Sequence, residues 1–147
     1  MDAHLHPRSA NRERPVLPGR GEPSAPPPGD AREGPHVATI GPKGEPQNNP
    51  VWFGFDGEYV KFSQTKTRQK YKNVGRDPRI ALSILDPENP YRYLEVRGEV
   101  EKIEDDPDND FINAMAKKYM DKDEYPFHRP GDERVVLFVR PDRTTKM

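Results

Sequence analysis

The chain has 147 residues, of which 33% are charged and 31% are hydrophobic, with a formal net charge of -1 and no cysteine. The lack of cysteine excludes disulfides, thiolate metal sites and thiol nucleophiles. A net charge this close to zero provides no overall field that would attract nucleic acid or an anionic membrane. No apolar run is long enough for a signal-peptide core or a membrane span, so we expect a soluble cytoplasmic protein.

Residues 1–34 differ in composition from the rest of the chain. They alternate proline, glycine and charged residues and contain almost no large apolar side chain. Such a segment cannot bury enough surface to offset the entropy lost on ordering. We therefore expect a disordered tail over 1–34 and a single folded domain over 35–147.

The first half of the domain contains short apolar runs separated by turn residues. The pattern predicts strands over 36–40, 50–55 and 58–63. The last two runs flank Asp56-Gly57, and Asp-Gly at such a place predicts a hairpin with a type I′ turn, which needs positive φ at both central residues.

A helix and two further strands are predicted next. Residues 67–74 suit a short helix, capped by a threonine hydroxyl and ended at Gly75. Strands are expected over 79–85 and 91–103, and Gly98 within the longer one indicates a bulge that bends it.

The C-terminal part predicts one more helix and one more strand. Residues 107–120 place Phe111, Met115 and Tyr119 on one face at a spacing of four, which is typical of a helix packed on a core. The last strand is expected over 134–139.

These elements together favour a mainly β fold. Six antiparallel strands with two or three short helices indicate a small barrel or meander rather than a parallel sheet. The folded part has few apolar residues, so dimerisation would add to its stability, and we expect a homodimer.

The segment FSQTKTRQKYKNVGRDPR concentrates positive charge in an otherwise neutral chain. Its cations oppose a single acid, Asp77, and they surround the start of the predicted helix, where cations are unfavourable unless an anion is bound. Backbone N–H groups, a threonine hydroxyl and basic side chains together form a phosphate site. A solvated basic helix without a ligand is the alternative. The cations are Lys66, Arg68, Lys70, Lys72, Arg76 and Arg79.

Three stretches of the chain resemble a known family. They read HVATIGPKGEPQNNPVWFGFDGEYVKFS, QTKTRQKYKNVGRDPRIALSILDPENPYRYLEVRG and RVVLFVRPDRTT. They are similar to the pyridoxamine phosphate oxidase-like split β-barrels, and most closely to the branch that uses the deazaflavin coenzyme F420. Relatives usually begin with a helix before the first strand, where this chain has its proline-rich segment.

The resemblance implies a dimeric split barrel of the FMN-binding type that takes hydride from reduced F420 to a conjugated organic acceptor, with FMN as the alternative cofactor. The strand-to-helix turn would hold the cofactor phosphate, the second strand would lie along the tricyclic ring, and two tyrosines would approach from the partner subunit. The implied cofactor-binding residues are Gln47, Asn48, Asn49, Pro50, Val51, Ser63, Lys66, Thr67, Arg68, Lys70, Asn73, Tyr91 and Tyr93.

The sequence contains no catalytic triad or carboxylate pair, and none is required, because the cofactor itself carries the hydride. His36 and His128 have no carboxylate or cysteine at ligand spacing, so no metal site is expected. Two alternatives stay open: a non-catalytic flavin or F420 carrier, and a nucleic-acid binder that uses the basic segment. The second is disfavoured because its cations are confined to one helix turn.

Overall fold

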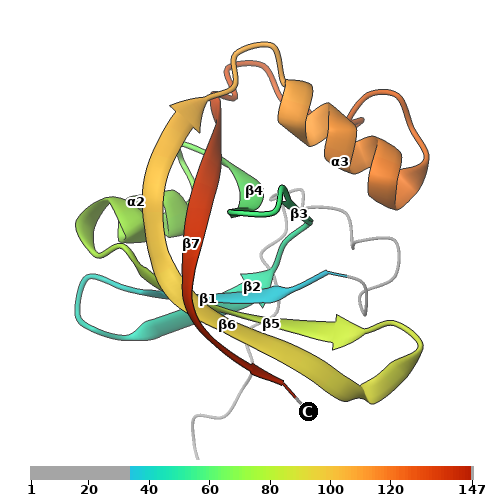
Figure 1. Cartoon of the computed structure of the whole chain (residues 1–147). Coiled ribbons are helices and arrows are strands. Elements are labelled where there is room, and N and C mark those ends of the chain that lie inside the picture. The colour runs from blue at the N-terminus through green and yellow to red at the C-terminus, as the bar shows by residue number, and fades with distance from the viewer. Residues whose placement is uncertain (1–33, 147) are drawn as a thin grey trace, which may run out of the picture.

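The computed structural model describes residues 34–146, and its centre is one curled antiparallel sheet (Figure 1). The sheet order is β2-β1-β5-β6-β7-β4-β3, which confirms the expected mainly β, antiparallel fold. The predicted tail lies outside the described residues, apart from Gly34. The strands are β1 (His36–Ile40), β2 (Pro46–Pro50), β3 (Phe53–Phe55), β4 (Val60–Thr65), β5 (Arg79–Asp86), β6 (Asn89–Asp105) and β7 (Arg134–Lys146).

Among the described residues the sheet has seven strands rather than six, because the run expected over 50–55 belongs to two strands. Pro50 ends β2, where it pairs with His36, and β3 begins only at Phe53. The sequence of β2 is PQNNP, which contains none of the β-branched or aromatic residues that favour strands. Its antiparallel pairing with β1 overrides that weak local preference.

The long strands β6 and β7 curl around the core because β6 is bulged (Figure 1). The register between them shifts between Arg97 and Gly98, as predicted, and again between Val100 and Lys102. A Cβ on Gly98 would lie 2.0 Å from the carbonyl oxygen of Arg140, so only glycine allows this close approach. β7 also continues to Lys146, beyond the predicted end at 139, because β6 offers it a partner along that whole length.

The β3–β4 hairpin is confirmed, but its turn is not type I′. Gly57 has φ 98°, whereas Asp56 has no positive φ. The Asp56 carboxylate instead accepts the N–H groups of Glu58 and Tyr59 at 2.9 and 2.7 Å. The loop is therefore longer than two residues, and a side chain stabilises it.

Helix α2 (Gln69–Arg76) lies between β4 and β5 in the chain, and both predicted ends were wrong. Its N-cap is Arg68, which forms no side-chain cap hydrogen bond, and the Thr67 hydroxyl lies 3.1 Å from that of Thr65 instead. The helix also continues past Gly75 to Arg76. The following Asp77-Pro78 pair ends it, because the residue before a proline is disfavoured in the helical region.

Helix α3 (Asp110–Met120) covers the sheet at β3 and begins three residues later than predicted. The buried carboxylate of Asp106 accepts the N–H groups of Asp110 and Phe111, both at 3.0 Å, and thereby caps the helix. Met115 is buried and Phe111 and Tyr119 are half-buried, which confirms the predicted face.

Two apolar clusters hold these elements together. The larger one lies inside the curl of the sheet and includes the fully buried side chains of Phe62, Leu82 and Leu137. The smaller one lies between α3 and the sheet, where Trp52 stacks on Tyr119 with ring centroids 5.3 Å apart. No helix within residues 34–146 is long and apolar enough to cross a membrane.

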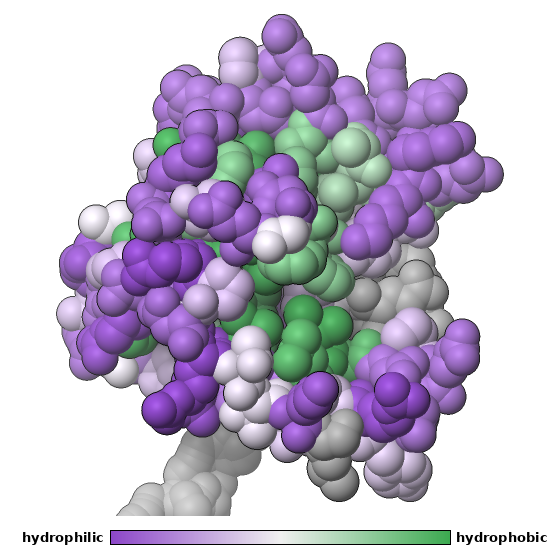
Figure 2. Space-filling model, in the orientation of Figure 1, coloured by the Kyte–Doolittle hydropathy of each residue, from purple (hydrophilic) through white to green (hydrophobic). Residues whose placement is uncertain are grey.

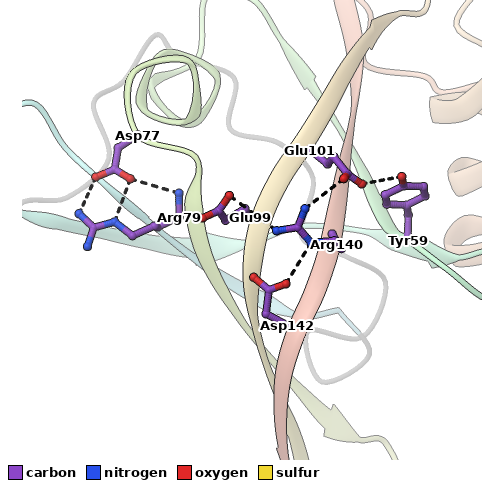
Figure 3. A network of polar contacts seen from close by, with 7 residues as sticks. All are labelled: Tyr59, Asp77, Arg79, Glu99, Glu101, Arg140 and Asp142. Atoms are coloured by element: carbon purple, nitrogen blue, oxygen red, sulfur yellow. Dashed lines mark hydrogen bonds and ion pairs between the residues drawn. The ribbon is translucent and has the colours of Figure 1, made fainter.

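A polar network crosses β6, β7 and the residue before β4 (Figure 3, which also draws the separate Asp77–Arg79 pair at the start of β5). Arg140 contacts Glu101 and Asp142 at 3.0 Å each and Glu99 at 3.8 Å. Glu101 also accepts a 2.6 Å hydrogen bond from the Tyr59 hydroxyl, which raises the pKa of Tyr59 to about 12. The network joins strands on the strongly bent part of the sheet.

Candidate functional site

The candidate site is the β4–α2 junction, which we define as residues 63–70, the side of β2 that faces α2, and Arg134 of β7. Several cations of the basic segment already have partners within the chain. Lys66 pairs with Asp105 at 3.1 Å, and Arg79 pairs with Asp77 at 2.7 Å. Arg76 donates to the carbonyl of Ile40. The structure therefore separates a cluster that looked uniform in the sequence.

Lys70 points inward from α2 and is only 6% exposed. Its ammonium group donates to Oδ1 of Asn49 on β2, so two predicted ligands from different elements are in contact. Burial, together with the nearby charge of Arg68, lowers the pKa of Lys70 to about 8. A buried ammonium with one amide partner retains donors for a further acceptor.

Arg68 is exposed at the start of α2 and forms no ion pair with a carboxylate of residues 34–146. Burial lowers the pKa of both Lys70 and Arg134, and the charge of Arg68 adds to that effect at each of them. The three cations are therefore close enough for one of them to act on the other two. Such an arrangement is unfavourable unless an anion lies between them.

Asn73 is completely buried and uses its side chain to fix α2 on the sheet. Its amide donates to Thr39 Oγ1 at 3.0 Å and to Gln47 Oε1 at 3.3 Å, and it accepts from Gln69 at 2.8 Å. Asn73 and Gln47, both predicted as ligands, are thus occupied with each other in this structure. Their contacts set the position of Lys70 relative to β2.

The backbone of β2 has a free edge, because β2 is the terminal strand of the sheet. Just after β2, the N–H of Val51 donates to the carbonyl of Pro35, and just before β2, the carbonyl of Glu45 accepts from the N–H of Gly41. Because the backbone groups of an antiparallel pair face the partner strand at every second residue, the N–H groups of Gln47 and Asn49 also face β1. The outward positions are Pro46, Asn48 and Pro50. Since proline has no N–H, Asn48 is the one residue of β2 whose N–H faces the free edge.

Ser63 lies near the end of β4 and is only 8% exposed. Its hydroxyl accepts a 3.1 Å hydrogen bond from Arg134 on β7, and the guanidinium of Arg134 lies 4.8 Å from the ring centroid of Tyr125. The Nε atom of Arg134 is buried without a hydrogen-bond partner, as is Oε1 of Gln64.

Residues 36–147 match the family model described as pyridoxamine 5'-phosphate oxidase. The chain belongs to this family. The match covers the whole curled sheet and both described helices, so the expected family resemblance is confirmed.

Three solved structures share the fold of this chain. An F420 reductase is 43% identical, with a TM-score of 0.69 over 78% of this chain and 90% of that chain. A conserved hypothetical protein from Mycobacterium tuberculosis is 21% identical, with a TM-score of 0.60 over 78% of this chain and 76% of that one. An FMN-binding relative from Nostoc punctiforme is 14% identical, with a TM-score of 0.57 over 78% and 73%. The last two show the fold alone.

None of the curated proteins matches this chain. Membership of the pyridoxamine 5'-phosphate oxidase family, together with the similarity to an F420 reductase, supports an oxidoreductase of the flavin type. The comparisons include both F420-related and FMN-binding proteins, so they leave the choice between these two cofactors open.

Tyr91 and Tyr93, the two tyrosines expected to act on a partner's cofactor, lie near the β5–β6 turn of this family member. They are 80% and 37% exposed. Within residues 34–146 no hydrogen bond connects either side chain to the β4–α2 junction. The chain by itself therefore brings the β2, β4 and α2 candidates together but not these two.

Arg134 is the residue of the junction that the sequence interpretation missed. It lies 58 positions after Arg76, in a strand that was predicted from the apolar run that follows it. The sequence offers one signal for it, a single arginine at the start of that strand. An arginine in this place is equally typical of an exposed strand end, so the signal does not identify a ligand. Only the pairing of β4 with β7 places it beside Thr65.

Proposed function

We propose that this protein is an F420-dependent oxidoreductase that transfers hydride from the reduced deazaflavin to a conjugated organic acceptor. The observation that carries the proposal is the 43% identity to an F420 reductase over 78% of this chain. The cations without carboxylate partners at the β4–α2 junction support it. The substrate is a small molecule of a class that includes quinones and enones.

The donors of the junction suit a phosphate. A hydroxyl at Thr67, a guanidinium at Arg68 and an ammonium at Lys70 are the groups that hold phosphate oxygens in proteins. The buried Nε of Arg134 without a partner supports the same interpretation, because buried donors are rarely left unpaired. Lys66, also proposed as a ligand, would first have to leave Asp105.

The ring would lie along β2 and near Ser63. Because the N–H of Asn48 faces the free edge, we assign that group the polar contact to the ring, and the flanking Pro50 and Val51 the apolar contact. The side chains of Gln47, Asn49 and Asn73 act as positioning groups in this proposal, since each already holds α2 against the sheet.

The chemistry requires orientation more than reactive side chains. Reduced F420, when bound, supplies the hydride. The chain's own residues would fix the phosphate and ring, exclude water and keep the acceptor against the ring. Holding the two reactants in this orientation accelerates the reaction, because the entropy of bringing them together is lost on binding. No side chain is assigned a proton-transfer role.

FMN is the second candidate cofactor, and one observation favours it: an FMN-binding protein shares the fold. Both cofactors present a tricyclic ring and a ribityl phosphate to the same kind of junction. The identity to that protein is 14%, against 43% to the F420 reductase, so we rank F420 first.

A homodimer is part of the proposal. Phe55 is 60% exposed and Tyr91 80%, a large exposure for aromatic side chains. Figure 2 shows apolar surface between α3 and the lower end of the sheet, on the open side of the curl. Contiguous apolar surface of this kind favours association, and a second protomer would bring its Tyr91 and Tyr93 toward the cofactor. Sedimentation velocity tests the dimer directly.

The experiment that tests the function is a binding titration followed by turnover. F420 and FMN are titrated separately against the fluorescence of Trp52, the only tryptophan, in the wild type, in Lys70→Ala and in Lys72→Ala, which changes an exposed cation on the same helix. We expect F420 to bind more tightly than FMN and Lys70→Ala alone to lose about 10- to 100-fold in affinity. Reduced F420 should then be oxidised when quinones or enones are added.

Each other outcome has a distinct meaning. Tighter binding of FMN would transfer the proposal to a flavin enzyme. Binding without oxidation by any acceptor would indicate a carrier. If the protein binds neither cofactor while its circular dichroism shows a folded β protein, the proposed function is wrong.

A further inference from the structure

Arg134 lies beside the predicted phosphate turn, although it comes from the last strand. It is the first residue of β7 and is the direct partner of Thr65, the last residue of β4. Opposite residues of an antiparallel pair project to the same face, with Cβ atoms about 5 Å apart. The Thr65 hydroxyl in turn lies 3.1 Å from that of Thr67. Arg134 therefore shares a face with the start of the turn.

The guanidinium of Arg134 is held in place but is not neutralised. Nη1 donates to Ser63 and the plane lies over Tyr125. Neither contact supplies a negative charge, and no carboxylate of residues 34–146 forms an ion pair with this side chain. Nη1 is used, whereas the buried Nε has no hydrogen-bond partner, so the guanidinium retains an unpaired donor.

The electrostatics of Arg134 point in the same direction. Burial lowers its pKa, and the charge of Arg68 lowers it further, while Tyr125 and Asp132 act in the opposite sense. Arg68 is thus a cation that acts on Arg134, and Asp132 is a carboxylate that acts on it without forming an ion pair. Asp105, the acid of β6 that reaches this region, is already paired with Lys66.

We propose that Arg134 is an additional ligand of the cofactor phosphate, binding it through the Nε–Nη2 edge on the side opposite Lys70, with Arg68 between them. This inference rests on the proposed function and names a residue for its phosphate site. A guanidinium edge presents two parallel N–H groups and matches two phosphate oxygens, which a lysine cannot do. The phosphate would accept the hydrogen bond that Nε of Arg134 lacks, and its negative charge would neutralise Arg68 and Arg134.

The first test compares ligands with and without phosphate. Dissociation constants are measured for F420 and FMN, and for riboflavin and a deazariboflavin that lack the phosphate, in the wild type, Arg134→Gln and Arg134→Lys. Arg143→Gln, an exposed arginine of the same strand, is the control. We expect Arg134→Gln to weaken only the phosphorylated ligands, by about 10- to 100-fold, with Arg134→Lys between it and the wild type.

The outcomes separate this inference from a structural role and from the proposed function. Equal losses for phosphorylated and phosphate-free ligands would mean that Arg134 only supports Ser63 and Tyr125, and this would overturn the inference. Unchanged affinities in Arg134→Gln would overturn it as well, while leaving the proposed function intact. If the wild type binds no cofactor, the proposed function fails, and the second test decides the role of Arg134.

The second test needs no cofactor. The Nε–Hε resonance of Arg134 and the backbone amides of Thr67 and Arg68 are followed by nuclear magnetic resonance while inorganic phosphate is added to the labelled full chain at constant ionic strength. Saturable shifts of all three, absent with chloride, support the inference. Shifts that leave Nε–Hε of Arg134 unmoved contradict it.

Discussion

The side-chain amide of Asn73 on α2 donates a 3.0 Å hydrogen bond to the hydroxyl of Thr39 on β1, inside the protein. Replacing Asn73 with leucine keeps the volume but leaves Thr39 and Gln47 without their buried donor. We expect the free energy of unfolding to fall by about 3 kcal/mol, since unpaired buried polar groups carry such costs. Urea unfolding, followed by the fluorescence of Trp52, measures the change.

Lys72→Ala is the matched control for this prediction, because Lys72 is exposed on the same helix. It should change the free energy of unfolding by less than about 0.5 kcal/mol. Cofactor affinity should also fall in Asn73→Leu, since Lys70 would no longer be fixed against β2. A leucine variant with wild-type stability would show that the amide contacts of Asn73 do not stabilise α2.

Lys70 should make the free energy of unfolding depend on pH between about 8 and 10.5. Its pKa is about 8 in the folded state against an ordinary 10.5, so below pH 8 the folded protein contains a buried charge. Between these two pH values the unfolded chain binds more protons than the folded one, and the free energy of unfolding therefore rises with pH, by about 3 kcal/mol. Lys70→Met should remove this rise, which denaturation at several pH values tests by difference from the wild type.

The same lysine should couple cofactor binding to protons. A bound phosphate favours the charged ammonium, so binding raises the pKa of Lys70 and the protein takes up protons when it binds at about pH 8 to 9. The affinity for F420 should fall as the pH rises above 8, and isothermal titration in buffers of different ionisation enthalpy should report the uptake. A flat affinity profile up to pH 10 would exclude Lys70 from the phosphate site.

The fold was predictable where a short apolar run lies between turn residues. The strands Arg79–Asp86 and Arg134–Lys146 begin with the apolar-rich runs RIALSIL and RVVLFV, and both were placed at the right start. β2 was missed because its residues have no intrinsic preference for a strand, and what holds it is tertiary: pairing with β1, and the contacts of Asn49 and Gln47 with α2.

The site was predictable only as a concentration of charge. The sequence locates the basic segment, but it does not show which cations remain unpaired. Asp105 neutralises Lys66 from β6, and Arg134 joins the junction from β7. Both effects depend on pairing between strands that are far apart in the chain, and a charge count along one segment contains no information about them.

Tyr59 should ionise well above the ordinary range of a tyrosine, because its hydroxyl donates to Glu101 and its pKa is raised to about 12 (Figure 3). Glu101→Gln removes the charge that the phenolate would oppose and should return the pKa of Tyr59 toward its ordinary value of 10.0. Because the folded state retains this proton longer than the unfolded chain, the free energy of unfolding should fall between pH 10 and 12, and less so in the glutamine variant.

Absorbance at the tyrosinate band follows this titration, and Tyr59→Phe identifies the step that belongs to Tyr59. Glu95→Gln, which neutralises a half-buried acid of β6 that pairs with Arg97, should leave that step in place. A pKa of Tyr59 that is the same in Glu101→Gln as in the wild type would mean that the Tyr59–Glu101 contact does not persist in solution.

Two glycines should respond in opposite ways to the same added methyl group. A Cβ at Gly98 would lie 2.0 Å from the carbonyl oxygen of Arg140, and neither strand of the β6 bulge can move without breaking its ladder. Gly98→Ala should therefore lower the free energy of unfolding by about 3 kcal/mol or more. Gly75 lies within α2, has no atom within 4 Å of the corresponding position and no positive φ.

Gly75→Ala should consequently stabilise the protein by about 0.5 to 1 kcal/mol, because alanine restricts the unfolded chain and favours the helix. Thermal unfolding of the two variants beside the wild type gives both signs in one experiment. The pair distinguishes a glycine required by close backbone contact from one that is only tolerated. A stable Gly98→Ala variant would mean that β6 bends through a different register, which would also displace Arg140 from the network with Glu101.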